Sequence, residues 1–100
     1  MNLKIEETDE KYVVTLEGDM DSPAVMDTEE LMEPLYKGDK EVIIDCSGLR
    51  YIASSGLRIL LGIIQGASNS GKNVVIRGLN DEIKNVFEMT GFINLFKLES

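Results

Sequence analysis

The sequence predicts a single α/β domain over residues 1–100, with a mixed, mostly parallel sheet and the element order β-β-α-β-α-β-α-β. Short segments that are apolar, or in which apolar and polar residues alternate, are typical of strands. In this sequence they are separated by longer segments whose apolar residues recur at helical spacing. Strand–helix–strand units of this length imply right-handed crossovers and parallel pairing. One hundred residues, of which 43% are hydrophobic, are enough to build one core.

The first two strands are predicted near the N-terminus. Apolar and polar residues alternate in Leu3–Glu6, and β-branched and aromatic residues dominate Tyr12–Glu17. A polar turn separates the two segments, so we expect them to pair as a hairpin. Gly18 is expected to end the second strand, and Asp19–Asp21 is expected to form a loop.

A first helix is predicted to begin at Ser22-Pro23, because serine is a favoured N-cap and proline is favoured at the first helical position. The helix is expected to run from Ala24 to about Tyr36. Pro34 predicts a kink or an early end near Glu33, because proline removes a helical hydrogen bond and clashes with the preceding turn. The buried side of this helix is expected to hold Val25, Leu31, Met32 and Leu35.

The second half of the chain continues the alternation. Glu41–Asp45 is short and apolar, as a strand inside a sheet would be, and a crossing over residues 47–53 is expected to follow it. A helix is expected from near Gly56 to about Ser68. The last elements are expected to be a strand at Val74–Ile76, a helix capped by Asn80 and ended by Gly91, and a strand at Leu95–Leu98.

Charge and composition restrict the partners. The net charge is −8, which repels nucleic acid and anionic membranes, and no basic stripe offsets it. The first residues lack the apolar region of a signal peptide, and the run Ile59–Ile64 is far too short to span a membrane. The single cysteine, Cys46, is expected to be a reduced core residue. We therefore expect a cytoplasmic protein that binds neither nucleic acid nor membranes.

The residues needed for enzyme chemistry are absent from the sequence. The chain has no histidine and one cysteine, which excludes a Ser-His-Asp triad and a histidine metal ligand and argues against a zinc site. No GxxxxGK[ST] or GxGxxG phosphate loop occurs. The carboxylate pairs Asp19/Asp21 and Glu29/Glu30 are interpreted as solvated surface of an acidic chain. We expect no catalytic activity, no metal and no cofactor.

Two adjacent serines, Ser54 and Ser55, lie where the helix near Gly56 is predicted to begin. The simplest interpretation is helix capping, for which serine is favoured. The alternative is a phosphorylation switch, because a helix N-terminus accommodates a phosphate well and the modification would add roughly −1.5 to −2 charge. Both interpretations can hold, one for each serine.

The helix after the serines is unusual on one side. Its core side is expected to hold Leu57, Leu60, Leu61, Ile63, Ile64 and Ala67, with Ile59 at the margin. The other side carries Arg58, Gly62 and Gly66, and each interior glycine costs about 1 kcal/mol relative to alanine. This glycine strip is either a weak part of a surface helix or a flat docking face that allows close approach of another backbone. A phosphate on Ser54 would border that face.

These residues resemble a known family. Ile-Ile-Asp-Cys-Ser-Gly-Leu-Arg-Tyr-Ile-Ala-Ser-Ser-Gly-Leu-Arg-Ile-Leu-Leu, residues 43–61, resembles the signature of STAS domains, and most of all that of the stand-alone bacterial anti-sigma-factor antagonists. Gly18–Asp21 and Ile83–Phe92 resemble two further segments of the family pattern. The resemblance spans nearly the whole chain and implies one STAS domain over residues 1–100.

The resemblance implies a function and its residues. Family members bind an anti-sigma factor that is itself a serine kinase, and so free a sigma factor for transcription. The kinase inactivates the antagonist by phosphorylating the first serine of the turn, here Ser54, and a PP2C-type phosphatase reverses the modification. The residues alone leave open whether Ser54 or Ser55 is the acceptor. The partner-binding residues are expected to be Asp21, Ser55, Gly56, Leu57, Arg58, Gly62 and Gly66.

The sequence departs from the family pattern at two positions, and the first departure keeps an alternative function open. Ala53 stands where the family usually has an aspartate just before the acceptor, and Arg58 stands at a position that is often glycine. The alternative function is a constitutive STAS interaction module in a signalling or lipid-transport assembly. In that case the serines would serve only as helix caps.

Overall fold

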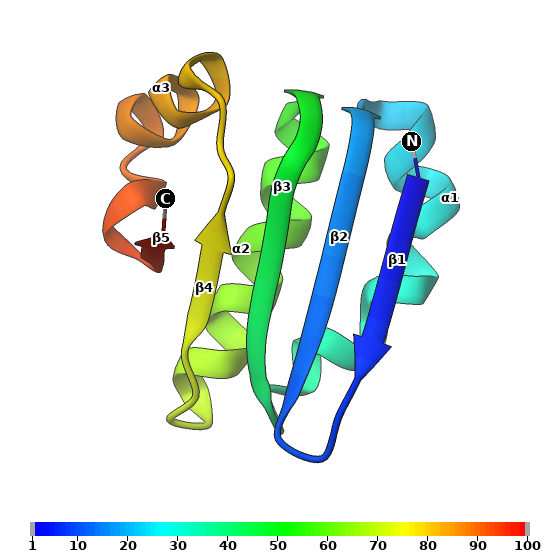
Figure 1. Ribbon diagram of the computed structural model, residues 1–100, viewed down its shortest axis with the longest axis vertical. Helices are drawn as coiled ribbons and strands as arrows, with labels where there is room; N and C mark the ends of the chain where they lie inside the picture. The colour runs from blue at the N-terminus through cyan, green and yellow to red at the C-terminus, as the bar shows by residue number, and fades with distance from the viewer. Residues whose placement is uncertain (1, 100) are drawn as a thin grey trace.

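A five-stranded sheet with the strand order β1-β2-β3-β4-β5 organises the chain (Figure 1). The computed structural model describes residues 2–99, and for Ser22, Ala24, Asp27 and Glu99 it describes the backbone alone. The strands are β1 (Asn2–Glu7), β2 (Lys11–Met20), β3 (Glu41–Ile52), β4 (Val74–Arg77) and β5 (Lys97–Glu99). The helices are α1 (Ser22–Met32), α2 (Ser54–Asn69) and α3 (Asp81–Thr90), with 3₁₀-helices η1 (Glu33–Lys37) and η2 (Phe92–Asn94).

The predicted fold class and element order are confirmed. β1 pairs with β2 antiparallel, as the predicted hairpin requires, and the pairs β2/β3, β3/β4 and β4/β5 are parallel. In Figure 1, α1 and α2 lie behind the sheet, and α3 lies beyond the upper end of β4. The core therefore lies between one face of the sheet and the helices, while most of the other face is left open.

Two strands are longer than the sequence predicted. β2 continues through Gly18 to Met20, and β3 continues through residues 47–52, where a crossing was expected. The extra pairing, up to Met20↔Ile52, contains two register shifts, and Gly18 has the positive φ of 92° that favours glycine. The predicted ends were wrong because ladder pairing outweighs the weak strand preference of glycine and serine.

The core of α2 also differs from the prediction. Ile59 is 4% exposed and belongs to the core, whereas Leu57 and Leu61 are only half-buried. The helix is therefore rotated slightly relative to the expected orientation. Cys46 is fully buried in β3, and burial raises the pKa of its thiol to about 12, so the predicted role of a reduced core cysteine is confirmed.

The first helix ends early, as Pro34 predicted. α1 stops at Met32, and Pro34 lies in the first turn of η1, where its missing N–H costs nothing. Gly38 then ends η1 in a left-handed conformation with a φ of 68°. Leu31 is 59% exposed and does not face the core, so that prediction was wrong. The predicted capping by the Ser22 side chain lies outside the described residues.

The third helix is capped as predicted. The Asn80 side-chain oxygen accepts a hydrogen bond from the Ile83 N–H at 2.8 Å, and Gly91 adopts the left-handed C-cap. The Asn80 amide also donates to the Leu49 carbonyl at 3.1 Å, which fixes the start of α3 to β3. The final strand is shorter and slightly later than predicted. Within residues 2–99, no helix has the length and apolar character needed to span a bilayer.

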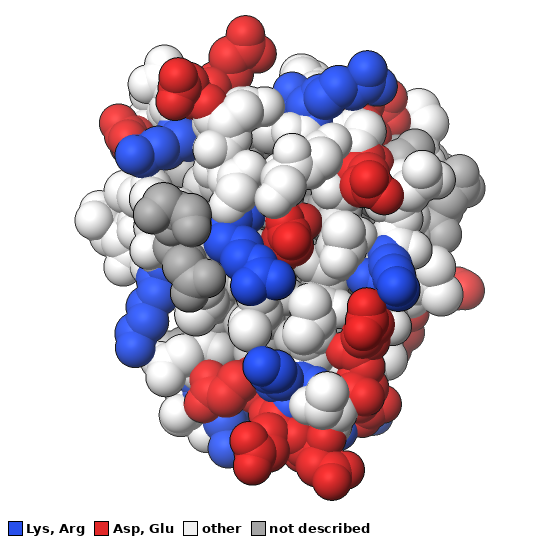
Figure 2. Space-filling model, viewed as in Figure 1, with Lys and Arg blue, Asp and Glu red and all other residues white. Residues whose placement is uncertain are grey.

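The open face of the sheet is a mosaic of charges. Figure 2 shows Lys, Arg, Asp and Glu side chains of both signs scattered over it, with acidic groups gathered at its lower end. Most of the large hydrophobic side chains that are exposed in the described chain are on α1, α3 and the C-terminal segment, and one, Tyr51, is at the end of β3. We therefore do not regard this face as the candidate site.

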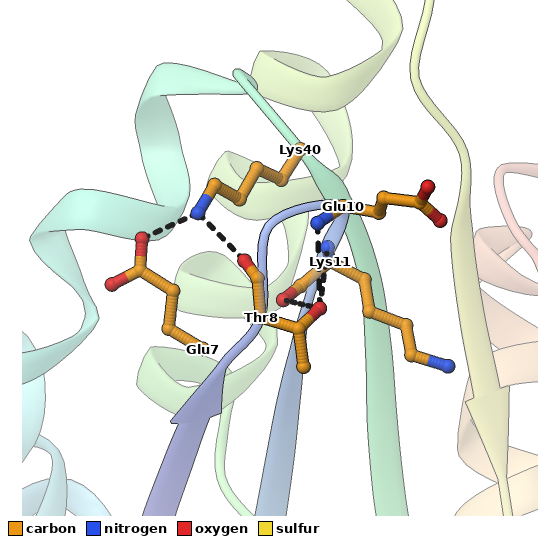
Figure 3. Close-up of polar contacts among 5 residues, drawn as sticks. All are labelled: Glu7, Thr8, Glu10, Lys11 and Lys40. Atoms are coloured by element: carbon orange, nitrogen blue, oxygen red, sulfur yellow. Dashed lines mark hydrogen bonds and ion pairs between the residues drawn. The ribbon is translucent and has the colours of Figure 1, made fainter.

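The end of the sheet near the β1–β2 turn is held by polar contacts (Figure 3). The Lys40 ammonium pairs with the Glu7 carboxylate and donates to the Thr8 carbonyl at 2.8 Å. Its nitrogen also lies 5.3 Å from the centre of the Tyr12 ring. The Thr8 hydroxyl closes the turn by accepting from the Lys11 N–H at 3.1 Å. These contacts join the hairpin to the segment that precedes β3.

Candidate functional site

The candidate site lies at the carboxyl edge of the parallel strands, where α1 and α2 begin side by side (Figure 1). The Ala53 N–H donates to the Met20 carbonyl at 2.9 Å, which ties the end of β3 to the end of β2. The Asp21 carbonyl accepts the first hydrogen bond of α1, from the Val25 N–H at 2.9 Å. Two helix N-termini, each with a partial positive charge, therefore meet at this edge.

Ser54 is the first residue of α2 and is exposed. The N-cap is Ala53, whose side chain makes no capping hydrogen bond. In the described part of the chain, the Ser54 hydroxyl has no hydrogen-bond partner. The capping interpretation is therefore wrong for Ser54, which leaves its hydroxyl open to solvent. Ser55 is half-buried at the second position of the helix.

The rest of the turn divides into a buried part and an exposed part. A Cβ on Gly56 would lie 2.8 Å from Cγ1 of Ile52 and 3.0 Å from Cγ of Met20, so this buried glycine lets α2 pack closely against the strand ends. Gly56 therefore positions the turn and presents no side chain to a partner. Leu57 is half-buried and Arg58 is exposed, so both can be contacted from outside.

Sequence reasoning missed Tyr51. This side chain is 53% exposed at the end of β3, three residues before Ser54. It borders a cavity of about 190 Å³ between the end of β3 and α3. Nearby, Arg50 and Asp19 form an exposed ion pair at 3.6 Å. An exposed aromatic ring beside a polar turn is typical of a protein-binding surface, and it was overlooked because the segment was expected to be a crossing.

The predicted glycine strip is closed by the chain itself. A Cβ on Gly62 would lie 2.9 Å from Cε1 of Tyr36. A Cβ on Gly66 would overlap the carbonyl oxygen of Tyr36 and lie 2.8 Å from the carbonyl carbon of Tyr36. Gly38 packs directly on the Gly66 carbonyl group. The two glycines do allow close packing, but the packing is against η1 of the same chain: the Tyr36 ring lies over Gly62, and the Tyr36 backbone lies over Gly66. The prediction that Gly62 and Gly66 form an open docking face was wrong.

The motif Asp45-Cys46-Ser47 has a structural role in β3. The Asp45 carboxylate accepts hydrogen bonds from the Ser47 hydroxyl at 2.6 Å and from the Ser47 N–H at 2.9 Å. These bonds, with Arg77 at 3.6 Å, hold the pKa of Asp45 below its usual value. Gly78 fits against Ser47 without room for a Cβ. The motif therefore fixes the middle of β3 to the end of β4.

Comparison with known proteins agrees with this fold and site. A family profile described as "Mlab, STAS domain" matches residues 3–97. An anti-sigma-B factor antagonist of Staphylococcus aureus (strain NCTC 8325 / PS 47) is 32% identical over 98 residues, covering 95% of this chain and 91% of that protein. The chain therefore belongs to the STAS-domain family. Within that family it is a homologue of the anti-sigma factor antagonists, which are regulatory proteins and not enzymes.

Solved structures show the same fold. SpoIIAA in its unphosphorylated form superposes with a TM-score of 0.77 at 19% identity, over 99% of this chain and 88% of that one. SpoIIAA of Bacillus in its phosphorylated form gives a TM-score of 0.76 at 20% identity, over 99% and 92%. An anti-sigma factor antagonist from Mycobacterium paratuberculosis gives 0.76 at 24% identity, over 97% and 83%.

Proposed function

We propose that the protein is a phosphorylation-controlled partner switch. In this scheme the unmodified domain binds a kinase-type anti-sigma factor and so releases a sigma factor. Phosphorylation of Ser54 ends the complex, and a PP2C-type phosphatase restores it. The observation that carries the proposal is the exposed Ser54 hydroxyl at the first position of α2, without a hydrogen-bond partner among the described residues.

The chemistry belongs to the partners. Ser54 Oγ would attack the γ-phosphorus of ATP on the kinase, forming the Oγ–P bond while the bond to the bridging oxygen of ADP breaks, and the hydroxyl proton leaves to a base. A phosphatase-bound water would later attack phosphorus, breaking the Oγ–P bond and releasing inorganic phosphate. This domain supplies only the hydroxyl and its position. The positive end of α2 would stabilise the phosphate once it is attached.

The surroundings of Ser54 explain how one phosphate would control binding. The proposed contact surface combines Tyr51, Leu57 and Arg58 with the neighbouring Asp21 and Ser55. A partner packed against the apolar part of this surface would have to accommodate a phosphate group and strip it of water. An uncompensated buried charge costs several kcal/mol, roughly enough to abolish a modest interface. No change of fold is required.

The relatives support the same proposal. SpoIIAA, which shares the fold, exists in unphosphorylated and phosphorylated forms, and the Staphylococcus aureus relative is named for antagonism of an anti-sigma-B factor. The placement of Ser54 at the exposed start of α2 is consistent with an acceptor in a comparable position.

The direct test is mass spectrometry of the protein isolated from its own cell. We expect one phosphopeptide spanning Tyr51 to Arg58, with the phosphate on Ser54. Replacement of Ser54 by alanine should abolish it, whereas Ser55→Ala should not. A phosphate on Ser55, or a label that persists in Ser54→Ala, would contradict the assignment.

Ala53 favours a second candidate, a constitutive STAS interaction module. It occupies the N-cap, where an aspartate would cap the helix, and a missing carboxylate beside Ser54 removes a group that could position the hydroxyl for a kinase. The two functions differ in one measurement. A stable complex with a purified kinase-type anti-sigma factor, without phosphate transfer to Ser54 in the presence of ATP and Mg²⁺, would favour the module.

A further inference from the structure

A groove runs along the side of the molecule where α1, η1 and α2 meet, and it begins beside the serine turn. It consists of two adjoining cavities of about 220 and 460 Å³, which share Met26, Glu29 and Tyr36 as lining residues. Ser55 and Arg58 line the end near the turn. Glu30 and Glu33 line the other end. The groove thus continues the proposed contact surface away from Ser54.

The groove also contains apolar side-chain surface that is not buried in the core. The Met26 side chain is 79% exposed, although it lies on a helix that buries Val25 and Met32. Beside it, Tyr36 is half-buried, with its ring against Gly62. Methionine is flexible and polarisable, so an exposed methionine next to an aromatic ring suits an apolar side chain inserted from a partner.

The walls of the groove are acidic. Met26, Glu29 and Glu30 lie on α1, and Glu33 follows at the start of η1, at the spacing i, i+3, i+4 and i+7, and all four line the same cavity. Burial and then the charges of Glu29 and Glu33 raise the pKa of the Tyr36 phenol, which agrees with carboxylates directed toward the ring. Among the described residues that line the groove, Arg58 is the one cation. The electrostatic potential in the groove is therefore negative.

We propose that this acidic groove binds a basic segment of the partner protein, with one apolar side chain placed over Met26 and Tyr36. Opposite charge is what such a surface selects. A second copy of this chain is disfavoured because its net charge is −8, and nucleic acid and anionic membranes have the wrong sign. The identity of the partner as an anti-sigma factor rests on the proposed function.

The acidic groove and the phosphate on Ser54 would affect binding in different ways. A phosphate on Ser54 would make the adjoining surface more negative, so charge repulsion would not expel a basic segment. Release on phosphorylation would instead come from the bulk and desolvation of the phosphate at the turn. The groove would provide charge-dependent recognition in both states, and this part of the binding would weaken as salt screens the carboxylates.

The test uses the full chain with methyl-labelled methionine and three short synthetic peptides. The first contains several lysines and one leucine, the second has that leucine replaced by alanine, and the third has the lysines replaced by glutamates. The Met26 methyl group reports on the groove. The Met89 methyl group is a matched reporter on α3, because it is 81% exposed and outside both cavities.

We expect the first peptide to shift the Met26 resonance and not that of Met89 at concentrations up to about 1 mM. Glu29→Gln combined with Glu33→Gln should weaken this binding about fivefold, and the alanine peptide should bind about threefold more weakly than the leucine peptide. Glu82→Gln on α3 is the matched charge control and should leave the affinity unchanged.

Equal shifts at both methionines, binding of the glutamate peptide, or no shift at Met26 would overturn the proposal. The experiment contains no kinase, so its result is independent of phosphorylation. If the groove binds and Ser54 is never phosphorylated, the groove remains as the docking site of a constitutive module. If Ser54 is phosphorylated and the groove does not bind the peptide, the proposal for the groove is refuted and the proposed phosphorylation switch is not affected.

Discussion

The two halves of α2 differ in what their residues contact. Its first turn carries the exposed Ser54 and Arg58, and the side chain of its N-cap residue, Ala53, makes no capping hydrogen bond. Its second half is closed, because Gly62 and Gly66 lie directly beneath η1. The difference indicates that one helix divides two tasks: the glycines hold the helix against its own chain, and the first turn stays available for another molecule.

The largest expected effect is on stability, from a change in the closed half. Gly66→Ala would place a Cβ against the Tyr36 carbonyl group, where backbone would have to move. We expect a loss of about 3 kcal/mol in the free energy of unfolding, at the upper end of overpacking costs. Urea denaturation at neutral pH measures it. An unchanged midpoint would show that η1 is not held against α2.

The next effect is on binding, from a change in the open half. Ser54→Asp should lower the affinity for a kinase-type anti-sigma factor about 100-fold, or about 2.7 kcal/mol, because a charge must be desolvated in the interface. The unfolding midpoint should not change. Ser54→Asn is the matched control, since it adds the same bulk without the charge. Wild-type affinity of Ser54→Asp would refute the switch, and equal losses in both variants would assign the effect to bulk alone.

A smaller effect is expected at the other glycine of the strip. Gly62→Ala brings its Cβ to 2.9 Å from a ring carbon of Tyr36, and the half-buried ring can move aside. Alanine also favours the helix by about 1 kcal/mol, so the net change in unfolding free energy should stay within about 1 kcal/mol of zero. The same denaturation series measures it. A loss as large as that of Gly66→Ala would mean that the ring is held rigidly.

The smallest effect is a pH dependence in β3, the strand that leads into the open turn. Hydrogen bonds from Ser47 lower the pKa of Asp45 in the folded state. Such a carboxyl adds stability at pH above its unfolded pKa of about 4, and this stability is lost as the pH falls through the lower folded pKa. Ser47→Ala should therefore cost about 0.5 kcal/mol at pH 7.

The difference between Ser47→Ala and wild type should shrink as the pH falls below about 4, where the carboxyl becomes protonated. Urea midpoints at neutral and acidic pH measure both values. In an Asp45→Asn background, Ser47→Ala should show no such pH dependence. A difference that stays constant with pH would show that Asp45 does not carry the effect.

The comparison also shows what the sequence can predict. Helix and strand periodicity was sufficient to predict the element order. Pro34 predicted the end of α1, and Asn80 predicted the start of α3, because these signals are local. The glycine spacing of Gly62 and Gly66 predicted a close backbone approach, which the structure shows at Gly66, whereas a side-chain ring approaches Gly62. It could not identify η1 as the approaching segment, because that depends on how the chain turns after Pro34.

The candidate site was predictable to a similar degree. Ser54 and Arg58 were expected on the exposed side of the helix start, and the structure places them there. Tyr51 was missed because the length of β3 is set by pairing with β2, which no local pattern reveals. The exposure of Met26 was not foreseen either, since it depends on where α1 docks on the sheet.

The open first turn of α2 has a consequence for how such a domain can diverge. Residues that do little for folding can be exchanged one at a time without a loss of stability that would remove the protein from the cell. Duplicated copies of the gene could therefore acquire separate signalling partners through changes at Arg58 or Tyr51. The same drift at Gly66 would be eliminated by selection, because the altered chain would lose a large part of its stability.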